Sequence, residues 1–208
     1  LMCTSHILNR EGNSGDNSEG NSQTTLEKYE KISHNICELI SIAKAHGTVF
    51  IVTNASLRWV HECIFKNLTP EVEEMMKSVG IFSTVDSGIA EKYDFPDRKK
   101  IAFAKLNGLF NKRNNTKHTL LCIGDCNHDR DAANHTREKI RDSTYVKNIK
   151  FIQAPSLDIL ISQQNLCISI LPSLYTSEVH MDHFLNPVSP NIKDFIQSDI
   201  IITRNYMA

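Results

Sequence analysis

The sequence lacks a long hydrophobic run, a surplus of charge of either sign and a secretory signal. A membrane-spanning helix needs about 18 consecutive apolar residues, whereas the most apolar stretch, 157–171, is broken by Asp158 and by the polar run 162–165. The 23 Lys and Arg residues are balanced by 24 Asp and Glu residues, which excludes a broad cationic surface for nucleic-acid phosphates. No basic segment followed by an apolar core is present at the N-terminus. The composition therefore predicts neither a membrane nor a nucleic acid as a partner.

Paired-cysteine motifs are also absent. The six cysteines form no CxxC pair and no regular spacing that would indicate a disulfide framework or a zinc site. Reduced thiols are typical of proteins in a reducing compartment. We therefore expect free cysteines and a cytoplasmic or nuclear location.

The chain is the size of one domain with appendages: 208 residues, 40% of them hydrophobic. Residues 9–25 contain no apolar side chain, so they cannot bury enough surface to offset the entropy of ordering. They predict a flexible polar insert within an N-terminal segment, 1–25. A core domain is expected over 26–186 and a C-terminal extension over 187–208, which includes an apolar stretch, 199–203, that predicts a strand of unknown placement.

Helical and strand patterns alternate along the predicted core. Apolar, β-branched runs indicate strands that are buried on both faces, and spacings of three and four indicate amphipathic helices. Such alternation predicts an α/β fold, a Rossmann-like open parallel sheet with helices on both faces. The strands are expected at 48–53, 81–85, 120–123 and 148–152, and the helices at 26–46, 56–68, 71–79, 98–110, 131–141 and 155–171.

Ligands of such sheets bind outside the carboxyl ends of the strands, where the first candidate is Thr53-Asn54. One interpretation is a strand-to-helix turn in which Thr53 or Ser56 caps the next helix. The other is a hydroxyl and exposed amides that bind an anionic group, helped by the following helix N-terminus.

The second candidate is the acidic segment that follows the strand at 120–123. Gly124 allows a sharp turn, and Asp125 and Asp129 can converge from a loop and from a first helical turn. Carboxylate oxygens in this arrangement are the ligands that Mg²⁺ prefers, with water and phosphate completing the octahedron. The alternative is that Asp129 and Asp131 merely complement the helix dipole. Asp131 is a third choice as a ligand.

A basic segment, Asp97-Arg98-Lys99-Lys100, lies between these two candidates at a predicted helix start. Cations are mildly unfavourable there because of the helix dipole, so Lys99 or Lys100 is expected to have a partner. The alternative is a solvated run of charge.

The ordered set of Thr53 in the strand segment IVTNA, a lysine at 99 or 100, and GDCNHD at 124–129 resembles motifs II, III and IV of the haloacid-dehalogenase-like (HAD) hydrolase superfamily. The resemblance is closer to a little-characterised HAD-like family of microbial eukaryotes and algae. It includes Trp59, Pro70, the segment 99–103 and Gly124 to Arg130, and it continues to about Leu185.

The resemblance implies a Mg²⁺-dependent phosphatase that works through an aspartyl-phosphate. Thr53 and the Asn54 amide would then contact a phosphoryl oxygen, and Lys99 or Lys100 would stabilise the charged intermediate. Asp125 would be the stronger metal ligand and Asp129 a second one, direct or through water. The short stretch from Thr53 to Lys99 leaves room only for a minimal cap, which implies an open site for a phosphorylated substrate such as a phosphoprotein.

Motif I, the DxDxT that carries the nucleophile in this superfamily, is absent from the sequence. The resemblance implies that the chain begins at Leu1 just after this motif, so that residues 1–25 are a remnant plus the polar insert. The central motif I strand would then be missing between the strands that end at Thr53 and Gly124, which would face a gap. We expect an inactive and unstable domain in the present chain.

Two other functions remain open. One is a non-catalytic protein-interaction module on the same fold, and the other is phosphotransferase or dehalogenase chemistry, which shares these motifs. A His-Met-Asp-His run at 180–183 has the residue types of a metal site, but the resembling family has an apolar and acidic segment there. We interpret it as ordinary packing.

Overall fold

The computed structural model describes residues 19–110, 118–139 and 144–185. Residues 9–18 of the predicted insert, the extension 187–208 and its predicted strand at 199–203 lie outside these ranges. None of the described helices is long and apolar enough to cross a membrane.

The protein has a mixed α/β fold in which all paired strands are parallel. The predicted α/β class is therefore confirmed. The described strands form two sheets, one of order β1-β2 and one of order β3-β4-β5. Their bounds are β1 Phe50–Thr53, β2 Gly80–Ser83, β3 His118–Gly124, β4 Thr144–Lys150 and β5 Met181–Phe184.

Helices connect the strands in the order that the sequence pattern predicts. Their bounds are α2 Glu19–His46, α4 Pro70–Lys77, α5 Phe95–Phe110, α6 Asn127–Lys139 and α7 Leu157–Thr176. The helix predicted at 56–68 is irregular: α3 (Leu57–Trp59) passes into a π-helix, η1 (Val60–Ile64), and then a 3-10 turn, η2 (Phe65–Asn67).

Several predicted boundaries are wrong in detail. Helix α2 begins at Glu19 rather than at Leu26, so the last part of the expected flexible insert is helical. Helix α5 begins at Phe95, which moves Lys99 from the helix start into the second turn. Strand β5 was not predicted, because its polar sequence MDHF lacks the β-branched pattern; pairing with β4 holds it in place.

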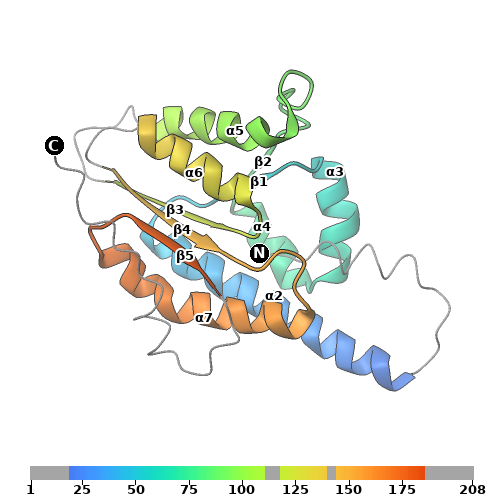
Figure 1. Cartoon of the computed structure of the whole chain (residues 1–208). Helices are drawn as coiled ribbons and strands as arrows, with labels where there is room; N and C mark the ends of the chain where they lie inside the picture. The colour runs from blue at the N-terminus through green and yellow to red at the C-terminus, as the bar shows by residue number, and fades with distance from the viewer. Residues whose placement is uncertain (1–18, 111–117, 140–143, 186–208) are drawn as a thin grey trace.

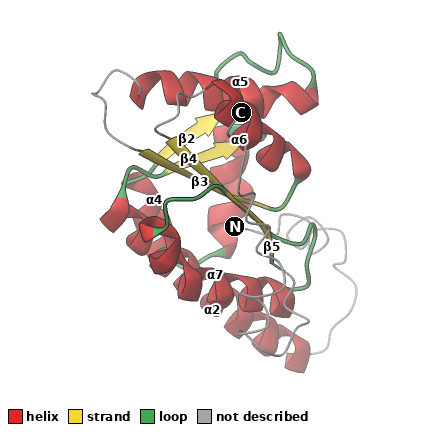
Figure 2. Cartoon of the chain, turned by 60° about the vertical axis from the view of Figure 1, so that its left-hand side comes forward, coloured by secondary structure: helices red, strands yellow, loops and turns green. Residues whose placement is uncertain are grey.

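The strands lie between two layers of helices, with α5 and α6 on one face and α2 and α7 on the other (Figures 1 and 2). The larger hydrophobic core lies on the α2 and α7 side. It includes Ile36 and Ile40 of α2, Cys167 and Leu171 of α7, and Ile149 of β4. A smaller cluster, which includes Cys122, Ala133 and Val146, lies under α5 and α6.

A cavity of about 190 Å³ separates β1 from β3. Phe50 and Val52 line one side of it, and four consecutive residues of β3, 120–123, line the other. A row of consecutive residues belongs to the edge of a strand, because alternate side chains point to opposite faces. In the described region, the edges of β1 and β3 therefore lie on opposite sides of a mainly apolar space. The HAD resemblance implies a missing strand at this position.

Candidate functional site

The carboxyl ends of β1 and β2 are joined by a compact set of hydrogen bonds. The backbone N–H of Thr84 donates to the carbonyl of Thr53 at 2.9 Å, and the Thr84 hydroxyl donates to Asn54 Oδ1 at 2.9 Å. The Thr53 hydroxyl accepts a hydrogen bond from the Ala55 N–H at 3.0 Å. These contacts fix the position of the Thr53 hydroxyl at the end of the strand.

The capping role that was open between Thr53 and Ser56 belongs to Ser56, whose side chain accepts a hydrogen bond from Trp59 N–H at 3.2 Å. Thr53 instead stabilises its own turn. Its hydroxyl proton is not used in that contact, since the hydroxyl acts there as an acceptor, so Thr53 can still donate to an anion.

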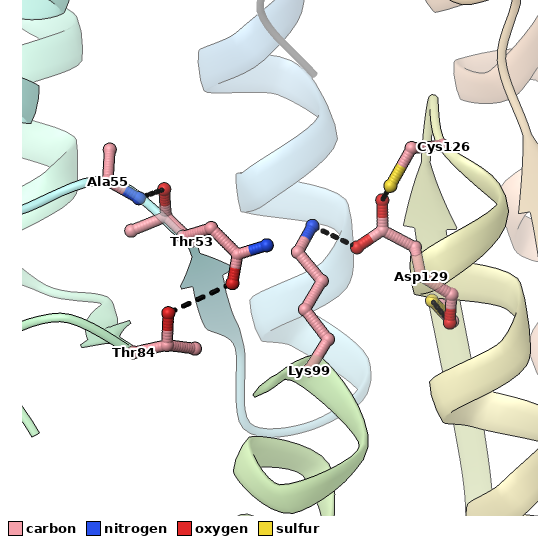
Figure 3. A network of polar contacts seen from close by, with 8 residues as sticks. Thr53, Ala55, Thr84, Lys99, Cys126 and Asp129 are labelled. Atoms are coloured by element: carbon pink, nitrogen blue, oxygen red, sulfur yellow. Dashed lines mark hydrogen bonds and ion pairs between the residues drawn. The ribbon is translucent and has the colours of Figure 1, made fainter. Parts of the chain in front are cut away.

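Lys99 is the lysine that reaches the centre of the site. Its ammonium group forms an ion pair with Asp129 Oδ1, and each of the two side chains is only 12% exposed. Figure 3 shows Lys99 with Asp129 on one side and with Thr53 and Thr84 on the other. Burial works against the charge of Lys99, but the Asp129 carboxylate outweighs it, and the net effect is a raised pKa of the ammonium group. Lys99 is therefore a cation across the physiological pH range.

Lys100 has a different environment. It pairs with Asp97 at 2.9 Å, one turn back on α5, where both side chains are more exposed to solvent. This is the solvated charge pair that the sequence left open as an alternative. The structure thus separates the two lysines that the sequence could not distinguish.

Asp125 and Asp129 converge as the sequence predicts, the first from the turn after β3 and the second from the first turn of α6. Together with Cys126 they form the one group of three or more residues in the described part of the chain whose acidic, thiol or imidazole donor atoms all lie within 4.8 Å of one another. Asp131 is exposed and outside this group. The third choice of metal ligand is therefore not brought to the site.

Gly124 is required at the end of β3 because Asp129 folds back over it. A Cβ atom at this position would lie 2.5 Å from Asp129 Oδ2 and 2.6 Å from its Cγ. No real Cβ atom tolerates such contacts, so any side chain here would displace the carboxylate. The sequence suggests that this glycine allows a sharp turn. In the structure, its role is to leave room for Asp129, the candidate ligand that packs against it.

Cys126 contributes a thiol that the sequence reading did not use. Its Sγ donates a hydrogen bond to Asp129 Oδ2 at 3.0 Å. Burial raises the pKa of the Cys126 thiol, and the hydrogen bond to Asp129 raises it further. The Cys126 thiol is thus a protonated donor that orients the Asp129 carboxylate. In the sequence, the only indication of this role is the position of Cys126 directly after Asp125.

Two further cations lie near the acidic cluster, and one of them, Lys150, contacts the turn that carries Asp125. Lys150, at the end of β4, donates to the backbone carbonyl of Asp125 at 3.2 Å. Arg130 of α6 forms a two-oxygen contact with Asp182 of β5, at 2.8 and 2.7 Å from Nε. The His-Met-Asp-His run therefore contributes a structural ion pair, and His180 accepts a hydrogen bond from the Val146 N–H at 3.1 Å. These contacts agree with the packing interpretation of that run.

The donor set fits a magnesium ion through its carboxylates but not through its thiol. Asp125 and Asp129 supply the hard oxygen ligands that Mg²⁺ prefers, whereas a protonated thiol is a poor ligand for it. Two carboxylates leave most of an octahedron to water and substrate oxygens, which is usual for Mg²⁺. The Lys99 ammonium neutralises Asp129 in the absence of a metal ion.

A scan against known protein families and searches of curated proteins and of solved structures find no match to this chain. The geometry described above therefore carries the functional proposal.

Proposed function

We propose that this chain forms a Mg²⁺-dependent phosphatase domain of the HAD-like type that is inactive because the DxDxT nucleophile motif is absent. One observation carries the proposal. The motif residues that the resemblance singled out, which are far apart in the sequence, come together at the carboxyl ends of the strands, with Lys99 paired to Asp129 and Asp125 beside it. A cation, a hydroxyl and two carboxylates are the groups that phosphoryl transfer needs.

Each residue has a defined part in this proposal. Asp125 and Asp129 hold Mg²⁺, which when bound offsets the negative charge of a phosphoryl group. The Thr53 hydroxyl and the Asn54 N–H donate to a phosphoryl oxygen. Lys99, fixed by Asp129 on α6, stabilises charge on the same group from the opposite side.

The cavity between β1 and β3 supports the same proposal. The HAD resemblance implies a central strand between these two strands, ending in the acid that attacks phosphorus. The chain contains no DxDxT, and the described strands form two separate sheets at this position. We therefore propose that the present chain binds the metal ion but does not turn over a phosphate ester by this route.

The substrate is proposed to be a phosphorylated macromolecule such as a phosphoprotein. The connection from β1 to α5 contains only short elements, α3, η1, η2, α4 and β2. No described segment of the size of a cap domain is inserted there. An open site of this kind admits a phosphate group that projects from a large surface.

The metal site is tested by substituting Asp125, the proposed stronger ligand. Asp125→Asn is expected to weaken the affinity for Mn²⁺, used as a paramagnetic probe for Mg²⁺, by about 10- to 100-fold or more. Asp131→Asn is the matched control, because it removes the same charge from an exposed position on the neighbouring helix α6. Water-proton relaxation or electron paramagnetic resonance measures the affinity, and Mg²⁺ should compete.

Equal Mn²⁺ affinity in Asp125→Asn and Asp131→Asn would contradict the proposed metal site. The alternative function, a non-catalytic protein-interaction module, would then gain weight, because the fold and the ion pair would remain without a metal-dependent role.

A further inference from the structure

An exposed aromatic rim borders the proposed site and has no part in the proposed function so far. It consists of the rings of Phe95 and His128, and Tyr93 precedes Phe95 by two residues in the chain. Phe95 is 52% exposed and Tyr93 43% exposed, and His128 is partly buried. The rings of Phe95 and His128 meet edge to face, with centroids 5.4 Å apart.

The rim lies directly outside the Lys99–Asp129 pair. Phe95 and Lys99 are one turn apart on α5 and share a face of that helix, while His128 and Asp129 are neighbours in the first turn of α6. The Phe95–His128 ring contact and the Lys99–Asp129 ion pair thus both join α5 to α6, at two successive levels along these helices. Both helices begin at the carboxyl edge of the strands. The ring contact, which lies closer to the helix starts, is therefore the outer level, nearer to solvent than the ion pair.

Arg98 holds this rim in place. Its guanidinium group lies over the Phe95 ring, 5.7 Å from the centroid, and donates hydrogen bonds to the backbone carbonyls of Tyr93 at 3.1 Å and Ala90 at 3.2 Å. Fixed rings lose less entropy on binding than mobile ones. Arg98 also adds a positive charge beside the rings, which is complementary to an anionic ligand.

From these observations we infer that the rim binds the ring of an aromatic phosphate ester whose phosphoryl group occupies the Thr53–Lys99 site. The inference rests on the proposed function and specifies its substrate class: an aryl phosphate such as a phosphotyrosine side chain, rather than an alkyl phosphate. One helical turn, about 5.4 Å, separates the two levels, and an aryl ester whose phosphoryl group is at the inner level extends its ring toward the outer one. Edge-to-face and stacked contacts with Phe95 and His128 would provide the discrimination.

The test compares two phosphate monoesters of equal charge, phenyl phosphate and methyl phosphate, on the full chain in the presence of Mg²⁺. Calorimetric titration is expected to show that phenyl phosphate binds about 3- to 10-fold more tightly, the usual range for one or two ring contacts. Phe95→Ala should remove this preference and leave methyl phosphate binding unchanged. Leu26→Ala is the control, because it removes an equally exposed apolar side chain (50%) from α2, on the opposite helix layer.

The His128 imidazole gives an independent readout. Its proton resonances should shift on addition of phenyl phosphate and not on addition of methyl phosphate. Equal affinity for the two esters, or a preference that survives Phe95→Ala, would overturn the inference and leave the phosphate site intact. Failure of both esters to bind would overturn the proposed function and the inference together.

Discussion

Filling the space between β1 and β3 with one extended apolar strand is expected to raise the melting temperature of the domain by about 10 °C. The two strands are not neighbours in either described sheet, and apolar side chains of β1, α5 and β3 line the cavity between them. A strand in this space would add hydrogen bonds to two edges and bury several apolar side chains. The net gain is about 3 to 5 kcal/mol after the entropy of ordering is subtracted, which corresponds to the stated shift for a domain of this size.

The experiment uses a version of the chain to which a designed apolar, β-branched strand ending in DxDxT is joined. Its melting is compared with that of the present chain by circular dichroism. A matched control carries a proline in the middle of the added strand, which removes a backbone donor and disrupts pairing. Equal melting temperatures of the present chain and of the chain with the added strand would contradict an open strand position between β1 and β3.

Lys99→Met is expected to lower the melting temperature by about 10 °C in the absence of divalent metal ions. The substitution keeps the length of the side chain but leaves the buried Asp129 side chain, which is only 12% exposed, without its cation. Breaking a buried pair in this way costs about 3 to 5 kcal/mol. Lys100→Met is the matched control, because Lys100 forms a solvent-exposed pair with Asp97, and exposed pairs contribute little to stability.

Magnesium makes this comparison specific for the proposed site. A Mg²⁺ ion bound to Asp125 and Asp129 would replace the charge of Lys99, so saturating Mg²⁺ should recover most of the stability that Lys99→Met loses. A ligand at about 100 times its dissociation constant stabilises the folded state by about 2.7 kcal/mol. A loss of the same size with Mg²⁺ and with a chelator would show that the pair is purely structural.

The fold class could be predicted from the sequence because its cause is local. The strand before Thr53 and the strand before Gly124 are short β-branched or apolar runs between amphipathic helices, and this alternation suffices for a parallel α/β arrangement. The convergence of Asp125 and Asp129 was likewise predictable, because a loop and the first turn of the next helix are close by covalent geometry.

The remaining features depend on contacts between distant segments. The choice between Lys99 and Lys100 depends on which side of α5 faces α6, and the true start of that helix at Phe95 lies before the predicted one. The burial of Lys147 in β4 could not be predicted from the sequence. It is possible because the Lys147 ammonium group donates hydrogen bonds to the backbone carbonyls of Leu174 and Ser177, at the end of α7. Strand β5 forms through its register with β4 and the Arg130–Asp182 pair rather than through its own β propensity.

Hydrolysis of an aryl phosphate by the chain that carries the added DxDxT strand is the most direct test of the proposed phosphatase site. We expect turnover that requires Mg²⁺ and falls by about 100- to 1000-fold in Asp129→Asn, while the present chain, without the added strand, shows none. Absence of turnover in a folded, Mg²⁺-loaded chain with the added strand would contradict the proposed site, as would turnover that does not depend on Asp129.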